Sequence, residues 1–160
     1  MNASEYTSMD AMGLADLVRK KEVTPKELLS IAIELVEAIN PKLNVISFRA
    51  YDLAAQQIEK ELDMNAPFAG VPMLLKDSGA IAKGIPASIG SRLAKGRTAE
   101  RDTELVARFK KAGFIIIGTT ATPEFCFTST TESVLSPSVR QRFLIETVRS
   151  VPQFSATIYK

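Results

Sequence analysis

Lys76 is the residue of this sequence best placed to carry chemistry. It follows the apolar run 71–75 and precedes Asp77, so it stands at the carboxyl end of an expected strand, where open α/β sheets usually bind their ligands. A lysine surrounded by desolvating side chains can have its pKa lowered enough to act as a base. The alternative is a strand-terminal lysine that is exposed to solvent or paired with Asp77. Spacing alone favours this second interpretation.

The residue types that are absent narrow the chemistry further. The sequence has no histidine, which excludes the commonest general base, the commonest zinc ligand and every Ser-His or Cys-His nucleophile. None of its eleven lysines completes a Ser-x-x-Lys motif, and no serine lies in a Gly-x-Ser-x-Gly turn. Residues 84–91 are glycine-rich but lack the spacing of a phosphate-binding loop. Catalysis must therefore use lysine, serine, tyrosine or carboxylates, and we expect no cofactor and no metal.

Composition and charge indicate one globular domain. The chain has 160 residues, of which 46% are hydrophobic and 24% charged, and its net charge is +2. This charge is too small for a general nucleic-acid or membrane-surface binder, and no apolar run approaches the roughly 20 residues of a membrane helix. The first ten residues have no signal-peptide pattern, and the single Cys126 excludes an internal disulfide. We expect a cytoplasmic protein without a nucleic-acid or membrane partner.

The first forty residues are expected to form two helices. Apolar spacing predicts one helix over residues 9–23, with Ser8 as its N-cap. Thr24 and Glu27 have the spacing of a capping box, with a proline at the first helical position between them. They predict a second helix that ends at about Asn40, because a proline follows.

Strands and a long loop are expected to position Lys76. A short strand over residues 44–48 and a helix over residues 49–63 precede a strand over residues 68–75, which delivers Lys76 at its end. Residues 78–101 have the glycine and proline content of an irregular loop, and loops of this length are uncommon without a function.

A second strand is expected to lie parallel to the strand that ends at Lys76. Asp102 is the predicted N-cap of a helix that Gly113 closes, and a strand over residues 114–118 follows. The order strand, loop, helix, strand predicts a parallel crossover in a twisted sheet. Beyond it, Phe125, Cys126 and Phe127 are expected in the core.

A change in composition divides the chain near Ser136. Residues 136–160 hold four basic residues against one acidic residue, whereas the first 135 residues sum to −1. No glycine follows Gly118. We therefore predict a folded part over residues 1–135 and a basic tail over residues 136–160.

Four segments in this order resemble the amidase signature family, whose members hydrolyse or transfer carboxamides. They are the run 68–77 that ends in Lys76-Asp77, Gly90-Ser91-Arg92, residues 101–119, and Thr122-Pro123-Glu124-Phe125. The two opening helices also look like the family, so the resemblance extends from about residue 8 to Leu135. Within the family the sequence is most similar to bacterial general amidases and cyclic-amide (nylon-oligomer) hydrolases.

The resemblance implies a fold and a role for Lys76. The implied fold is α/β, the N-terminal part of the amidase signature fold, with helices packed on a mixed, largely parallel twisted sheet that is incomplete in this chain. Family members use a Ser–cis-Ser–Lys triad, and by resemblance Lys76 is the catalytic lysine. It would take a proton through the bridging serine and return it to the leaving amine. The substrate would be a small-molecule amide.

One departure from the family decides what we expect of this chain alone. Both catalytic serines of the family lie in a Gly-Ser-rich segment shortly after the part that resembles residues 130–135, and this sequence has no such segment. We therefore expect a truncated, inactive N-terminal amidase fragment whose last 25 residues arise from a frame change, an alternative exon end or a gene-model error. The alternative is a non-catalytic binding or assembly module that associates through exposed sheet edges.

Overall fold

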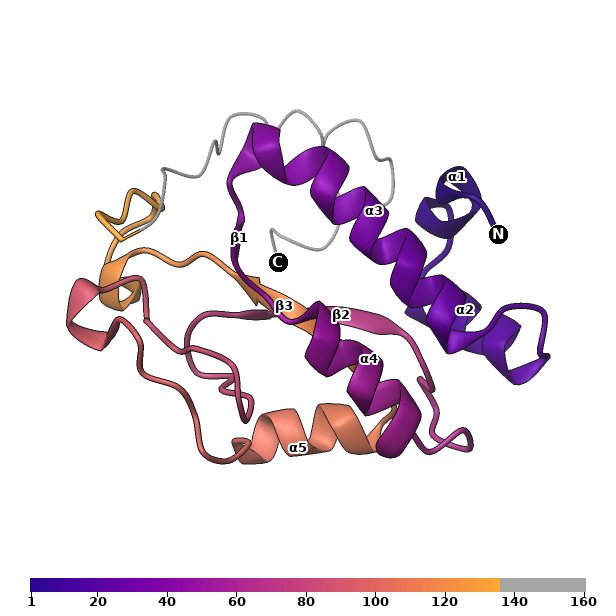
Figure 1. Cartoon of the computed structure of the whole chain (residues 1–160). Coiled ribbons are helices and arrows are strands. Elements are labelled where there is room, and N and C mark those ends of the chain that lie inside the picture. The colour runs from indigo at the N-terminus through magenta and orange to yellow at the C-terminus, as the bar shows by residue number, and fades with distance from the viewer. Residues whose placement is uncertain (136–160) are drawn as a thin grey trace, which may run out of the picture.

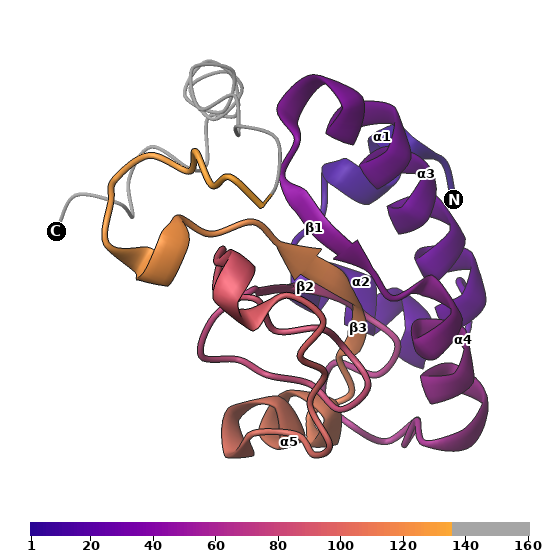
Figure 2. The same cartoon turned by 60° about the vertical axis from the view of Figure 1, so that its left-hand side comes forward.

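A three-stranded mixed sheet separates two layers in the computed structural model, which describes residues 1–135 (Figure 1). Helices α3 and α4 cover one face of the sheet, and helix α5 and the loop 78–101 lie on the other (Figure 2). The helices are α1 (Ala3–Thr7), α2 (Ala11–Arg19), α3 (Pro25–Leu43), α4 (Tyr51–Lys60) and α5 (Glu104–Lys111). The strands are β1 (Ile46–Arg49), β2 (Pro72–Lys76) and β3 (Ile115–Thr120), and the single-turn 3-10 helices are η1 (Arg92–Ala94) and η2 (Glu124–Cys126).

Helix α3 begins as the sequence predicts and ends later. The Thr24 hydroxyl accepts a hydrogen bond from the Glu27 amide, and the Glu27 carboxylate accepts one from the Thr24 amide, so the capping box is formed. The Glu27 carboxylate accepts hydrogen bonds from the Thr24 amide and from the Thr24 hydroxyl, and these two bonds hold its pKa below the usual range. The predicted end at Asn40 is wrong, because the helix continues through Pro41 to Leu43. A proline in the last turn removes only one intrahelical bond, and the Asn44 amide still bonds the Asn40 carbonyl at 2.7 Å.

Two other predicted N-caps are wrong, because each helix begins one or two residues later in the chain than expected. Asp10, not Ser8, caps α2 by accepting from the Gly13 amide at 2.8 Å, while Ser8 ends the short helix α1, which the sequence analysis missed. Asp102 does not cap α5, whose N-cap is Thr103. The Asp102 carboxylate instead accepts from the Lys83 amide at 2.7 Å and pairs with Lys110 at 2.9 Å. It therefore fastens the loop 78–101 to α5.

The strand order is β1-β3-β2, with β2 parallel and β1 antiparallel to the central strand β3. The parallel crossover from β2 to β3 is thus confirmed. Strand β2 begins at Pro72 rather than at Phe68, because residues 68–71 form a turn in which the Phe68 amide bonds the Ala112 carbonyl at 2.8 Å. Lys76 still ends the strand, opposite Thr120 of β3.

Strand β3 supplies side chains to both layers. Ile115 and Ile117 pack with Leu29, Ala32 and Ala54 of the α3–α4 layer. Ile116 packs on the opposite face, in a cluster with Leu75 of β2, Val106 of α5 and the loop residues Ala82 and Ile85. A third cluster joins α2 to the start of α3 and includes Leu14, Val18, Leu28 and Val71. The two clusters to which β3 contributes thus lie on opposite faces of the sheet.

A buried glutamine completes the hydrogen bonding of β3 where β1 does not reach. Strand β1 pairs with residues 118–120 of β3, whereas β2 pairs along residues 115–120. Beside the first residues of β3, Gln57 of α4 donates to the Phe114 carbonyl at 2.8 Å and accepts from the Ile116 amide at 3.2 Å. One side-chain amide therefore replaces the missing part of the ladder.

This arrangement predicts that substitutions of two adjacent glutamines have very different effects on the free energy of unfolding. Replacement of Gln57 by leucine leaves the buried Ile116 amide and Phe114 carbonyl without these bonds, so we expect the free energy of unfolding to fall by about 1–3 kcal/mol. Gln56→Leu changes an exposed side chain of the same helix and is the control, with an expected change within about 0.5 kcal/mol. Urea unfolding followed by circular dichroism measures both. Equal effects would show that the Gln57 hydrogen bonds do not stabilise the sheet.

Candidate active site

Lys76 lies at the carboxyl end of β2 with its side chain exposed. Lys76 of β2 pairs with Thr120 of β3, and Thr120 pairs on its other side with Ile46 of β1. Within residues 1–135 its ammonium group has no carboxylate within ion-pair distance. The sequence prediction of a strand-terminal lysine is confirmed, and the lysine is exposed rather than buried in these residues.

The neighbouring carboxylate is not the partner of Lys76. Asp77 is 5% exposed and accepts hydrogen bonds from the Ser88 amide, at 2.9 Å, and from the Ser88 hydroxyl. The Asp77–Lys76 pair that the sequence left open is therefore not formed. Side chains alternate along a strand, so Leu75 and Asp77 face α5 and the loop, while Leu74 and Lys76 face the side covered by α3.

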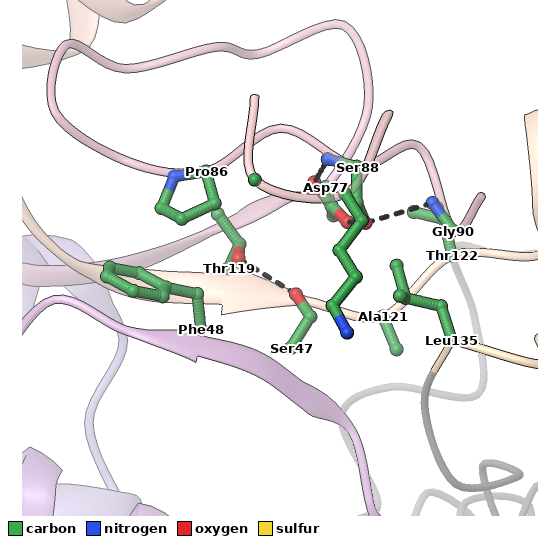
Figure 3. Close-up of a pocket in the computed structure, with 12 residues that line it drawn as sticks. Ser47, Phe48, Asp77, Pro86, Ser88, Gly90, Thr119, Ala121, Thr122 and Leu135 are labelled. Carbon is green, nitrogen blue, oxygen red and sulfur yellow. Dashed lines mark hydrogen bonds between the residues drawn. The ribbon is translucent and has the colours of Figure 1, made fainter. Parts of the chain in front are cut away.

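On the loop side, hydroxyl groups, the Asp77 carboxylate, Lys95 and apolar side chains line a cavity of about 240 Å³ (Figure 3). Asp77 and Ser88 lie at one wall, and the Ser47 and Thr119 hydroxyls share a hydrogen bond of 2.8 Å at another. Thr122 also lines this cavity, and it is 1% exposed with a hydroxyl that has no hydrogen-bond partner in the described part of the chain. No local sequence pattern indicates this constellation, because its members come from all three strands and from the loop.

The loop and the segment after β3 hold each other in place. The Ser91 side chain, which is fully buried, donates to the Glu124 carboxylate at 2.6 Å, and the Ser133 hydroxyl donates to the Gly90 carbonyl. Gly90 has φ +66°, and a Cβ atom there would collide with the Thr122 carbonyl oxygen and lie 3.0 Å from Pro123. The cavity wall therefore depends on a glycine at residue 90.

On the helix side, the charges near the end of β1 neutralise one another. The Arg49 guanidinium donates to the Glu37 carboxylate at 2.6 and 3.1 Å, and the Tyr51 hydroxyl donates to it at 2.6 Å. The hydrogen bond from Arg49 is the main cause that holds the pKa of Glu37 below its usual range. Burial, with the bond to Glu37, raises the pKa of Tyr51 to about 12.

Phe125, Cys126 and Phe127 do not lie in the core of the described residues, so that prediction is wrong. All three are exposed, and Phe127 is 87% exposed. Phe125 and Cys126 have φ of +50° and +60° within the turn η2, so the backbone does not follow the regular periodicity that would bury apolar residues on one face.

The described residues contain no cluster of three potential metal-ligating side chains. None of the helices in this part of the chain is both long enough and apolar enough to cross a membrane. Lys76 and the hydroxyl-lined cavity are thus the chemical features that the fold brings to the carboxyl end of β2.

A family model described as Amidase matches residues 27–141. The chain belongs to the amidase family. Over 125 residues this amidase chain is 38% identical to 6-aminohexanoate-cyclic-dimer hydrolase of Paenarthrobacter ureafaciens, covering 77% of this chain and 25% of that protein. The chain thus spans about a quarter of the length of the curated relatives that it matches.

Solved structures extend this similarity to the fold. A 6-aminohexanoate cyclic dimer hydrolase complexed with substrate matches this amidase chain with a TM-score of 0.77 and 35% identity, over 82% of this chain and 27% of that one. A bacterial aryl acylamidase of the amidase signature enzymes matches with a TM-score of 0.69 and 28% identity, over 81% and 29%. The α/β architecture is therefore part of the amidase signature fold, and it is incomplete within the described residues.

A pair of glycine substitutions tests how the amidase chain builds the cavity wall. Gly79 and Gly90 both have positive φ, but a Cβ at Gly79 meets no atom within 4 Å. Gly79→Ala should cost about 1–3 kcal/mol of unfolding free energy through backbone strain alone, and Gly90→Ala about 1–3 kcal/mol more through overpacking. Urea unfolding of the two variants measures the difference. A Gly90 variant as stable as the Gly79 variant would contradict the close packing at Thr122.

Proposed function

We propose that this chain is the N-terminal part of an amide hydrolase and that Lys76 is its catalytic lysine. The observation that carries the proposal is a lysine at the carboxyl end of β2 that has no ion-pair partner within residues 1–135, in a chain that is 38% identical to a 6-aminohexanoate-cyclic-dimer hydrolase. The carboxyl ends of β2 and β3 also form the edge where ligands bind to open sheets. Lys76 is the lysine that stands at this edge of β2.

The proposed reaction is acyl transfer from a carboxamide to a serine. The serine oxygen bonds to the carbonyl carbon, its proton passes through a second serine to neutral Lys76, and Lys76 returns the proton to the amine nitrogen as the C–N bond breaks. Water then cleaves the acyl-serine ester and releases the carboxylate. A lysine can take the place of histidine here only if burial lowers its pKa, so the mechanism requires Lys76 to be covered.

The serines of the described residues support the proposal that this part of the chain lacks the nucleophile. Ser47 is bonded to Thr119, Ser88 to Asp77 and Ser91 to Glu124, and Asp77 faces away from the side on which Lys76 lies. Residues 119–160 contain no glycine, so these residues hold no Gly-rich serine loop of the family type. We therefore propose that residues 1–135 supply Lys76 without its nucleophile. The predicted tail over residues 136–160 lies outside the described residues.

The proposed substrate is a small-molecule carboxamide. The relatives are named as hydrolases of a cyclic dimer of 6-aminohexanoate and of aryl acylamides. The alternative function, a binding or assembly module, is favoured by the exposed apolar side chains Leu93, Phe127 and Val134. Turnover distinguishes the two functions.

A fusion to the relative tests the role of Lys76. Residues 1–135 replace the corresponding N-terminal quarter of the Paenarthrobacter ureafaciens hydrolase, and release of 6-aminohexanoate from the cyclic dimer is measured. We expect the fusion to hydrolyse the dimer and Lys76→Ala to lower kcat/KM by about 10²- to 10⁴-fold, because proton transfer is lost. The unmodified 160-residue chain should show no turnover.

Lys83→Ala is the matched control, because Lys83 is also exposed but lies in the loop on the other face of the sheet. It should retain the activity of the unsubstituted fusion. If Lys76→Ala and Lys83→Ala fusions are equally active, Lys76 is not catalytic. Turnover by the 160-residue chain that depends on Lys76 would overturn the proposal that the nucleophile is missing.

A further inference from the structure

The peptide groups on both sides of Lys76 are bonded to the same residue of the central strand. The Thr120 hydroxyl donates to the Leu75 carbonyl at 3.3 Å, and the Asp77 amide donates to the Thr120 carbonyl at 3.0 Å. These two bonds bracket the backbone of Lys76, which is the last residue of β2. Strand ends open more easily than strand interiors, so the direction of the Lys76 side chain depends on Asp77 staying in place.

The side chain of Asp77 is anchored to the loop 78–101. Asp77 is 5% exposed, and its carboxylate accepts hydrogen bonds from the Ser88 amide, at 2.9 Å, and from the Ser88 hydroxyl (Figure 3). Within residues 1–135 the carboxylate has no cation at ion-pair distance. Burial of a carboxylate is costly unless hydrogen-bond donors replace the lost water. Ser88 supplies such donors and thereby keeps Asp77 in its buried position.

The loop in turn holds Ser88. The Ser91 amide donates to the Ser88 carbonyl at 2.9 Å, so the chain turns tightly just after Ser88. The Ser88 hydroxyl, which donates to Asp77, also accepts from the Gly90 amide at 3.3 Å. The hydroxyl thus has one donor and one acceptor, and its orientation toward Asp77 is fixed.

Asp77 acts on Lys76 through the backbone, because the two adjacent side chains point to opposite faces of the sheet. We propose that Asp77 and Ser88 position Lys76: the bonds between them fix the last peptide group of β2, and with it the direction of the lysine side chain. The consequence for catalysis rests on the proposed function, whereas the anchoring of the strand end does not.

Ser91 provides a matched control within the same loop. Like Ser88, it donates to a carboxylate, that of Glu124 at 2.6 Å, and it accepts from an amide two residues later, that of Leu93 at 3.3 Å. Glu124 belongs to η2, after β3, rather than to the end of β2. Ser88→Ala and Ser91→Ala therefore remove the same kinds of hydrogen bond, but only Ser88→Ala removes one beside Lys76.

Hydrogen exchange followed by NMR on the full 160-residue chain tests the strand end. The reference is the amide of buried Ile115, which donates to the Val71 carbonyl at 2.9 Å and reports global unfolding. Relative to this amide, Ser88→Ala should raise the exchange rate of the Asp77 amide at least about tenfold, because the strand end opens locally. Ser91→Ala should leave the ratio of the two rates unchanged. Ser88→Thr retains a hydroxyl and should restore the ratio of the unsubstituted chain.

The fusion to the Paenarthrobacter ureafaciens hydrolase tests the consequence for catalysis. Ser88→Ala should lower kcat by about 10- to 100-fold, because a displacement of a reacting group by about 1 Å has effects of this size. KM should stay the same, since the substitution does not remove a group that binds substrate. Ser91→Ala should change neither constant, and Ser88→Thr should recover kcat.

Three results would overturn the inference. They are an exchange ratio that Ser88→Ala leaves unchanged, equal changes in kcat for Ser88→Ala and Ser91→Ala, and a loss for Ser88→Ala that is confined to KM.

The comparison with Lys76→Ala separates this inference from the proposed function. If the Lys76→Ala fusion remains active while Ser88→Ala accelerates exchange at Asp77, the proposed function is wrong and the anchoring of the strand end is retained. If Lys76→Ala abolishes turnover and Ser88→Ala does not slow it, Lys76 is catalytic without being positioned by Asp77 and Ser88.

Discussion

The described structure depends on the burial of β3 between two layers that cover opposite faces of the sheet. Ile115, Ile116 and Ile117 are at most 3% exposed, and their alternation sends them to opposite faces. Burial of side chains of this size stabilises a fold by about 1.5–3 kcal/mol each. Strand β3 also orders both neighbours, since β1 and β2 pair with it and not with each other. Loss of β3 would therefore release Lys76 from its place as well.

The sequence alone predicts those elements that interactions between neighbouring residues specify. Thr24 and Glu27 specify the start of α3 through bonds that span three residues, and the apolar run before Lys76 specifies a strand. The parallel crossover followed from the order of the elements and from general handedness rules. The position of Lys76 at the end of a strand follows from the same apolar run, whereas its catalytic role is a proposal that rests on the family resemblance.

The structural features that the sequence does not predict depend on contacts between residues that are far apart along the chain. Asp102 looks like an N-cap, but the amide of Lys83 and the ammonium of Lys110 occupy its carboxylate. The role of Gln57 requires that β1 be shorter than β3, which no local pattern records. The cavity around Thr122 likewise forms only when three strand ends and a loop meet. Phe125 and Phe127 are exposed because the turn there does not have the regular period that their residue types suggest.

The register of β2 on β3 separates two adjacent residues of opposite charge into different environments. Side chains alternate along β2, and the extra residue in its pairing is Ile117 of β3, between the partners of Met73 and Leu74, so Asp77 lines the cavity on the loop side while Lys76 faces the side covered by α3. A shift by a single residue would exchange the two sides along the whole strand, and a carboxylate would then stand where the amine stands now. The chemistry of this sheet edge is therefore encoded in the length of the chain between the turn at residues 68–71 and the end of β2. Insertions or deletions there would change it more profoundly than most substitutions, even though the amino-acid types on the strand would stay the same.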